Sequence, residues 1–339
     1  MFYVKDILQA LDELTGGRVI KSHADYSSGK HPFVLMKSSN LPGKSIVETP
    51  GLVYGDLDKE IKKIAVTMTM TEGSIEMAGA TGVDAIVAHH PIAEAANSGG
   101  VTLKNYLDLY GIAAFELHEA FHGLHPGISF LHGHRAYRSE ISYGGEHGNV
   151  LFVGKTVADV RTLGDMLHRL DRFMGLHEEE SLVFVEKEIR GVSSLIETSL
   201  VTKGRILVGN EDSLVENILH IFPHTGFTSD HLRQAVIEHP EADTVLASIS
   251  RVYEGHELIE TARELGLNFV VGNCHVLEIL ENGLPLAYAL QSLLPGVEIV
   301  IFRERITSTR LDEVGTLDMK QYAYDMASQY LIQKVKNDI

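Results

Sequence analysis

From residue 61 onward, the sequence alternates between short apolar runs and amphipathic stretches that end at glycine. Residues 61–69 (IKKIAVTMT) and 83–88 (VDAIVA) are typical of strands, and EGSIEMAGATG between them is typical of a helix ended by Gly82. A strand that is apolar throughout is typical of a parallel sheet covered on both faces. This order predicts a βαβ unit and an α/β fold.

The same order continues along the chain. Residues 102–111 predict a helix and 112–117 a third strand, and helices and strands alternate again over residues 256–302. Between Gly127 and Glu254 we expect strands in NVLFVG, SLVFVE, GRILVG and DTVLASI, and helices in TVADVRTLGDMLHRL and SDHLRQAVIEH. The chain is therefore predicted to form two linked α/β lobes with mostly parallel sheets.

We place residues 1–127 and 275–339 in the first lobe and residues 128–274 in the second, with an insertion near residues 185–223. The Ser-, Gly- and Lys-rich region 21–50 predicts a surface loop or extended arm. A last helical segment (MKQYAYDMASQYLIQKVK) suits packing against another subunit or domain.

Charge and composition exclude several classes of partner. The 29 Lys and Arg residues against 46 Asp and Glu residues give a net charge of −17, which disfavours binding to nucleic acid and to anionic membranes. No apolar stretch reaches the ~18 residues of a membrane span. The single cysteine, Cys274, excludes an internal disulfide framework, and the first residues lack the pattern of a secretory signal. We expect a cytoplasmic protein.

Metal-competent side chains follow three of the predicted strands. In open α/β sheets, ligands bind outside the carboxyl ends of the strands. The sequence therefore predicts a metal site in a cleft at these strand ends. The candidate metal ligands are His89, His90, His118, His122, Cys274, His275 and Glu278.

The spacing of these residues favours two ions rather than one. Adjacent residues on a strand point in opposite directions, so His89 and His90 are placed to hold different ions. His118 and His122 have the i, i+4 spacing of one helical face. Glu278 is the candidate for a carboxylate that bridges the ions. Imidazole and carboxylate ligands fit two divalent ions from among Zn, Fe, Mn, Ni and Co.

Structural roles for these histidines and two weaker motifs are alternatives to the predicted two-ion site. A single histidine at a strand end is more often a hydrogen-bonded structural residue, and only the number of such residues favours a metal site. GHELIE offers His256 as a rival ligand, but it opens a helix instead of following a strand. FVGKT lacks the earlier glycine of a phosphate-binding loop. The other histidines are expected to be core or solvated, although HGH could bind a metal weakly; they include His132, His134, His168, His220 and His239.

The stretch from Gly51 to Ile92, with GIAAFELHEAFH and ETARELGLNFVVGNCHVLE, resembles the YbgI/YqfO-type dinuclear metal-centre family, the NGG-interacting-factor-three-like proteins. The resemblance implies that His89, His90 and His118 are ligands and that Glu278 is the bridge. His122 stands where the family has a bridging aspartate, and Cys274 aligns with the last metal-binding histidine, one place before His275. Either of these two residues could ligate. The resemblance also implies a ring-shaped homo-oligomer, often hexameric.

Two functions follow as expectations. Family members are described as homologues of a type 2 GTP cyclohydrolase, so the first is a metal-dependent hydrolase of a small molecule such as a nucleotide or pterin, using a metal-activated water. Glu278 and His122 are its candidate catalytic residues, and His125 or Glu119 could also move protons. The alternative is a metal-binding protein without turnover, such as a sensor, insertion factor or reservoir. A scaffold without ions is the third interpretation.

Overall fold

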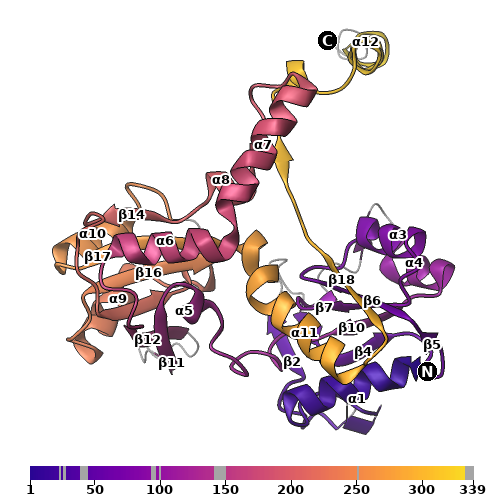
Figure 1. Cartoon of the computed structure of the whole chain (residues 1–339), viewed down its shortest axis with the longest axis horizontal. Helices are drawn as coiled ribbons and strands as arrows, with labels where there is room; N and C mark the ends of the chain where they lie inside the picture. The colour runs from indigo at the N-terminus through magenta and orange to yellow at the C-terminus, as the bar shows by residue number, and fades with distance from the viewer. Residues whose placement is uncertain are drawn as a thin grey trace.

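Two sheets with helices on both faces make up most of the molecule, and an arm projects from them (Figure 1). The computed structural model describes residues 1–22, 24–25, 28–38, 45–92, 97–98, 101–140, 150–249 and 252–332. The predicted α/β fold class is confirmed. Among the described residues, no helix combines the length and the apolar character that a bilayer crossing requires.

The first sheet has five strands in the order β18-β6-β7-β10-β4. The strands β18, β6, β7 and β10 run parallel, and β4 closes the edge antiparallel to β10. The strand bounds are β4 (Gly51–Tyr54), β6 (Lys63–Thr67), β7 (Ala85–Ala88), β10 (Ala113–Glu116) and β18 (Glu298–Phe302).

Alternating side chains of these strands point to opposite faces of the sheet and pack into two separate hydrophobic cores. Ile64, Val66 and Phe115 pack with α1 (Val4–Thr15) and α11 (Leu284–Leu293) on one face. The other face packs on α3 (Glu72–Ala80) and α4 (Leu103–Tyr110), and its buried residues include Ala65, Ile75, Ala78, Ile86, Leu103, Leu107 and Ala114. Burial on both faces explains why these strands are apolar throughout.

The second sheet has six strands in the order β11-β12-β15-β16-β17-β14. β15, β16 and β17 are parallel, whereas the other pairings are antiparallel, so this sheet is mixed. The strand bounds are β11 (His134–Glu140), β12 (Val150–Thr156), β14 (Arg205–Val208), β15 (Asn217–Ile221), β16 (Thr244–Ile249) and β17 (Asn268–Cys274). α6 (Leu163–Met174) covers one face, and α9 (Ser229–Glu238) and α10 (Glu257–Glu264) cover the other.

The prediction of a strand in SLVFVE is wrong, because these residues lie in α7 (Leu176–Arg190). Glutamates occupy the first turn of this helix, Lys187 and Arg190 the last, and Gly191 ends it with left-handed backbone geometry, all of which favour a helix. The helix predicted from residue 156 begins at Leu163, where the Thr162 side chain accepts a hydrogen bond from the Asp165 amide. The strands β4, β11 and β15 of the two sheets were not predicted from the sequence.

The arm combines two parts of the chain that are far apart in sequence. α7 rises away from both sheets, and β13 (Ile196–Glu197) pairs with β19 (Thr307–Ser308) beside it. Beyond β19 lie η5 (Leu311–Glu313), α12 (Leu317–Met326) and the π-helix η6 (Ala327–Leu331). α12 and η6 agree with the predicted last helix as far as residue 332, and the remainder of that prediction lies outside the described residues.

Shorter elements complete the fold. Part of the predicted loop over residues 21–50 is a hairpin, of which β2 (Leu35–Ser38) pairs with β3 (Ser45–Glu48). The others are β1 (Phe2–Tyr3), β5 (Glu60–Ile61), β8 (Asn97–Ser98), β9 (Val101–Thr102), α5 (Gly127–Leu131), α8 (Thr198–Val201), η2 (Pro223–Thr225), η3 (His275–Leu277) and the π-helix η4 (Ile279–Gly283). The domain limits given above, including the insertion near 185–223, stay a prediction.

Candidate metal centre

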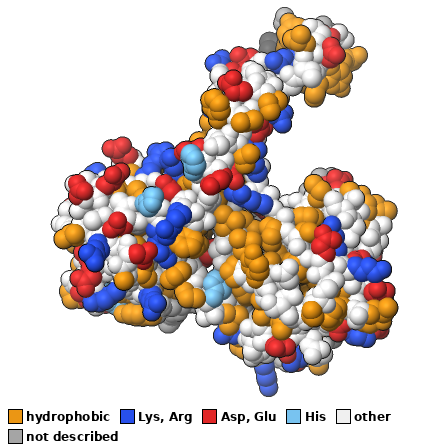
Figure 2. All heavy atoms as spheres, viewed as in Figure 1, with side chains coloured by type: hydrophobic (Ala, Val, Ile, Leu, Met, Phe, Trp, Pro, Cys, Tyr) orange, Lys and Arg blue, Asp and Glu red, His pale blue; other side chains and the backbone are white. Residues whose placement is uncertain are grey.

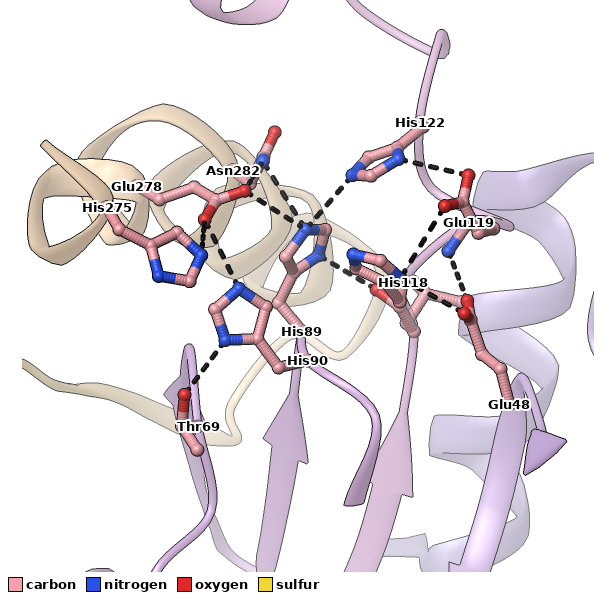
Figure 3. A network of polar contacts seen from close by, with 11 residues as sticks. Glu48, Thr69, His89, His90, His118, Glu119, His122, His275, Glu278 and Asn282 are labelled. Atoms are coloured by element: carbon pink, nitrogen blue, oxygen red, sulfur yellow. Dashed lines mark hydrogen bonds and ion pairs between the residues drawn. The ribbon is translucent and has the colours of Figure 1, made fainter. Parts of the chain in front are cut away.

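Side chains from three separate parts of the chain meet at the carboxyl ends of β7 and β10 (Figure 3). His89 and His90 follow β7, and His118 and His122 follow β10. The third contribution comes from η3 and η4, which continue directly from β17 of the second sheet. The candidate residues, far apart in sequence, therefore lie at one edge of the first sheet.

His89 is fully buried and oriented by the backbone. Its Nδ1 donates to the carbonyl oxygen of Leu117 at 2.9 Å, which leaves the lone pair of the ring on Nε2. That nitrogen lies 3.3 Å from Nε2 of His122. Burial holds the pKa of His89 well below its ordinary value, so the imidazole is neutral, as a metal ligand must be.

Two carboxylates orient the histidines that follow β10. Nδ1 of His118 donates to Glu48 at 3.2 Å, and Nδ1 of His122 lies 3.3 Å from Glu119. Glu48 also accepts the backbone amide of Glu119 at 2.6 Å. A carboxylate on Nδ1 fixes the tautomer and directs Nε2 inward, an arrangement common behind metal-bound histidines.

The second group lies around Glu278, which is 5% exposed. Its Oε2 accepts from Nε2 of His90 at 3.2 Å and from Nε2 of His275 at 3.0 Å. On the other side of the His90 ring, Nδ1 lies 2.8 Å from Oγ1 of Thr69. The rings of His90 and His275 are stacked with their centroids 4.6 Å apart.

Glu278 also reaches the first group with its other oxygen. Oε1 lies 3.7 Å from Nε2 of His89 and accepts from Nδ2 of Asn282 at 3.3 Å. Burial alone would raise the pKa of Glu278, but the hydrogen bonds from His275 and His90 bring it well below its usual range. The carboxylate is ionised and lies between the two groups.

The π-helix η4 places Glu278 and Asn282 on the same side. Pro285 has no backbone N–H and cannot complete an α-helical bond to the carbonyl of Glu281, which favours the wider turn. Asn282 Nδ2 lies 3.4 Å from Nε2 of His89. Single π-turns of this kind are frequent at functional sites.

Three sets of side chains in the described part of the chain have ligand atoms within 4.8 Å of one another and could hold a metal ion. The first two sets are independent, and the third shares His118. In the third set the carboxylates contact Nδ1 of His118, and we interpret them as its supports. The sets are His89, His118 and His122; His90, His275 and Glu278; and Glu48, His118 and Glu119.

These donor sets fit divalent ions. The first is made of three imidazoles whose Nδ1 atoms have partners elsewhere, and the second combines two imidazoles with one ionised carboxylate. Nitrogen donors with a single carboxylate suit borderline transition ions rather than Mg²⁺ or Ca²⁺. Such groups support a metal-binding protein, and the ligand roles of the individual residues stay predictions.

Two sequence candidates lie apart from these sets. Cys274 packs in an apolar cluster around Leu170, Met174 and Leu277, and burial raises the pKa of its thiol. Since His275 contacts Glu278, the geometry favours His275 over Cys274 as the ligand. His256 is the N-terminal cap of α10, where its Nδ1 accepts from the Leu258 amide at 3.2 Å.

Sequence reasoning missed Glu48, Thr69 and Asn282. Glu48 and Thr69 belong to strands or turns without a recognisable motif, and they meet the histidines only through tertiary contacts. Asn282 has a weak signal, because it lies four residues after Glu278 on the same helical path.

Other titratable groups border the site. Burial raises the pKa of Glu281 well above its usual value, so this carboxyl group keeps its proton, and its Oε2 has no hydrogen-bond partner among the described residues. Nδ1 of His125 accepts from the Gly127 amide at 3.1 Å, and burial lowers the pKa of His125. His224, from the second lobe, lies close enough for the charges of His275 and Glu278 to act on it.

A different set of histidines is buried inside the second lobe. Nε2 of His134 lies 3.2 Å from Nδ1 of His220, and His220 also contacts the Ser248 hydroxyl. His132 donates from Nδ1 to the Ile128 carbonyl at 2.7 Å and accepts from the Asn273 amide at 3.1 Å. Burial lowers the pKa of His132 to about 4 and of His134 to about 3. These residues are neutral core histidines.

Residues 35–98 match the family model described as Duf34/NIF3 (NGG1p interacting factor 3). This segment contains β7 and both of the adjacent histidines, His89 and His90. The family resemblance expected from the sequence is thereby confirmed. The comparison with curated proteins gives no match.

Solved structures share the fold at low sequence identity. Reduced HcgD from Methanocaldococcus jannaschii is 18% identical, with 84% of this chain and 98% of that chain covered and a TM-score of 0.50. The protein ybgI is 14% identical over 89% and 98%, with a TM-score of 0.50. TTHA1606 from Thermus thermophilus is 13% identical over 89% and 98%, with a TM-score of 0.51. These likenesses extend to the fold and no further.

Proposed function

Residues 35–98 match the Duf34/NIF3 family model, and from this premise we propose that the protein binds two divalent metal ions, one at each of the groups that contain His89 and His90. His89, His118 and His122 hold one ion, and His90 and His275 hold the other. Glu278 bridges them.

The position of Glu278 is the observation that supports this proposal best. One oxygen faces His89 at 3.7 Å, and the other lies within 3.2 Å of His90 and His275. A carboxylate with one oxygen for each ion holds two cations about 3.5–4 Å apart, the spacing of two-metal hydrolytic sites. The imidazole-rich shell favours Zn, Fe, Mn, Ni or Co.

We propose a hydrolytic reaction on a small molecule, of the cyclohydrolase type or directed at a nucleotide or pterin. Two bound ions would supply a water of lowered pKa and would polarise a carbonyl or phosphoryl oxygen. The chain itself supplies proton carriers at the border of the site. Glu281 holds a proton, and the neutral His125 ring can accept one.

A metal-binding protein without turnover is the second candidate, and His122 is the observation in its favour. It stands where the resemblance expects a bridging aspartate, so the first group has neutral donors only. Fewer negative ligands hold ions less tightly, which suits a sensor, insertion factor or reservoir. In either case we propose a cytoplasmic homo-oligomer, for which the resemblance implies a hexameric ring.

Metal content tests the dinuclear proposal. After purification under reducing conditions, elemental analysis should find two transition ions per chain, and Glu278→Gln should retain one at most. Glu197→Gln, a buried carboxylate that caps α8 in the second lobe, is the matched control and should retain two. A Glu278→Gln protein with both ions and full turnover would remove the bridging role.

A substrate panel separates the two candidate functions. Nucleotides, pterins and phosphoesters are incubated with protein loaded with Mn, Fe, Co, Ni or Zn. Hydrolysis of one class, lost in Glu278→Gln, supports the hydrolase. Two tightly held ions with no hydrolysis of any compound support the binding protein.

A further inference from the structure

The arm, defined as residues 176–197 with residues 303–331, is a folded projection. Nη1 of Arg303 contacts Glu179 at 2.7 Å, and Nη1 of Arg305 contacts Glu186 at 2.8 Å. Further out, Glu313 accepts from the amide and the hydroxyl of Ser194 at 2.9 and 2.7 Å. Polar contacts thus fix the two parts of the chain to each other.

The apolar side chains of the arm are mostly outside. Its own cluster of buried residues in the described chain comprises only Val183, Val192 and Leu195. Exposed hydrophobic residues run along α7 and gather at the tip (Figure 2). Those of α7 are Leu182, Phe184, Val185 and Ile189, and those near the tip are Leu311, Val314, Leu317, Met319, Tyr322, Tyr324, Tyr330 and Leu331.

The accessible surface of the whole chain is too large for a compact monomer. A monomer of 37.3 kDa is expected to expose about 13,700 Å², whereas this chain exposes 18357 Å². The excess, about 4,700 Å², is comparable with the area of obligate subunit interfaces. Large exposed apolar patches of this kind mark protein interaction sites.

A groove of about 670 Å³ runs between α7 and the segment that holds Arg303 and Arg305. Leu182, Val185 and Ile189 form its apolar floor. Arg303 and Arg305 line it as well, but they are paired with Glu179 and Glu186, which also line it. The polar border of the groove is therefore made of ion pairs that are already formed within the chain. It is large enough for several side chains.

α12 has the properties of a helix that could fill this groove. None of its residues is buried, and it lies beyond the outer end of α7, away from both sheets (Figure 1). An isolated helix of ten residues is unstable in water, so α12 needs a surface to pack on. Leu317 and Tyr324, both exposed, would fill an apolar groove.

We propose that the occupant is a second copy of this chain, with α12 of each copy seated in the groove of the other. Every chain has both the groove and α12. In a two-fold symmetric pair, each α12 therefore covers the groove of the other chain, and both surfaces are buried in one contact. This inference rests on the homo-oligomer proposed above and is independent of the metal centre.

Sedimentation velocity of the full-length protein tests the contact. Leu182→Glu with Ile189→Glu, or Leu317→Glu with Tyr324→Glu, should raise the dissociation constant of the assembly at least tenfold. Ile237→Glu, an equally exposed apolar position on α9, is the control and should assemble like the wild type. Far-UV circular dichroism spectra, unchanged in all variants, show that each is folded. A monomeric wild type would overturn both the oligomer and the arm contact, and an assembly insensitive to both arm variants would overturn the arm contact alone.

Cross-linking tests the exchange itself. Lys187 on α7 and Lys320 on α12 are natural targets for a lysine-reactive reagent. An assembly re-formed from light and heavy-isotope chains should give mixed Lys187–Lys320 links, which only two different chains can produce. An assembled sample without mixed links would overturn the exchange.

Discussion

At the scale of single residues, the candidate centre is built by the partners of its histidines. His89 is held by a backbone carbonyl and His118 by Glu48, so each ring has one nitrogen committed and one directed inward. Such supports raise the basicity of the ligand and fix its direction. Glu48 is therefore expected to matter for binding although it is not a proposed ligand.

Glu48→Gln is predicted to weaken metal binding about 10–100-fold, because the amide cannot accept from His118 with the strength of a carboxylate. Competition with a chromophoric chelator measures the affinity. Glu116→Gln is the matched control, since this buried carboxylate of β10 accepts the backbone amides of Thr49 and Ile92. It should lower stability and leave the affinity unchanged. Equal losses in both variants would contradict the support role.

The sequence allowed the strand-end histidines and Glu278 to be chosen as candidates, because an abrupt change from apolar to metal-competent residues is a local signal. Glu48 could not be chosen in this way. It lies 70 residues before His118, and the contact depends on how β3 and β10 are brought together in the fold. Asn282, 193 residues after His89, presents the same difficulty.

At the scale of elements, β17 leads directly into η3 and η4, the turns around which His275, Glu278 and Asn282 lie. Gly272 lies in this strand under the ring of His132, where an added Cβ atom would overlap Nε2 of that ring. Because His132 is fully buried and hydrogen-bonded at both nitrogens, it has no room to move away. The close approach requires glycine at this position.

Gly272→Ala is predicted to lower the free energy of unfolding by about 1–3 kcal/mol, the usual cost of overpacking. Urea denaturation measures it. Gly73→Ala in α3 is the control: its nearest neighbour, Thr71 Oγ1, is 4.0 Å from the added Cβ. This change should be neutral or stabilising by up to about 1 kcal/mol, since alanine favours helices. A neutral Gly272→Ala would show that β17 is more adaptable than the packing implies.

Element prediction succeeded where the period was clear and failed in α7. The parallel strands of the first sheet are short, apolar and bounded by glycine-ended helices, and each was assigned correctly. In α7, Leu182, Val183, Phe184 and Val185 form an apolar run that is typical of a strand. The helix survives because Leu176, Glu179 and Val183 share its inner face, while most of that apolar run is exposed on the arm. Apolar residues that are exposed on the chain's own surface do not follow the periodicity of a buried face, so their pattern does not predict the secondary structure.

At the scale of the whole molecule, the buried histidines of the second lobe make stability depend on pH. Their pKa values in the folded protein, about 4 for His132 and about 3 for His134, lie below the ordinary value of 6.5. The unfolded chain therefore binds protons more readily than the folded one. The stabilisation is complete above pH 6.5 and is lost as the pH falls toward the folded values.

The free energy of unfolding is predicted to fall by about 2 kcal/mol for His134 alone between about pH 7 and pH 5. Denaturation curves at several pH values give the slope. His134→Gln should have a slope that is shallower by this amount, whatever its stability at pH 7, whereas exposed His168→Gln should keep the wild-type slope. An unchanged slope in His134→Gln would contradict a neutral buried imidazole.

The segment from β17 through η4 to α11 has a consequence for motion. It leaves the second sheet, passes the twin histidines with Glu278 and Asn282, and enters the helix that packs on the first sheet. The same stretch of backbone thus connects the two sheets and carries residues of the candidate metal centre. Because this segment is attached to both sheets, a rotation of the second sheet relative to the first would pull on Glu278, and the position of the second sheet would then influence how the candidate metal centre holds its ions.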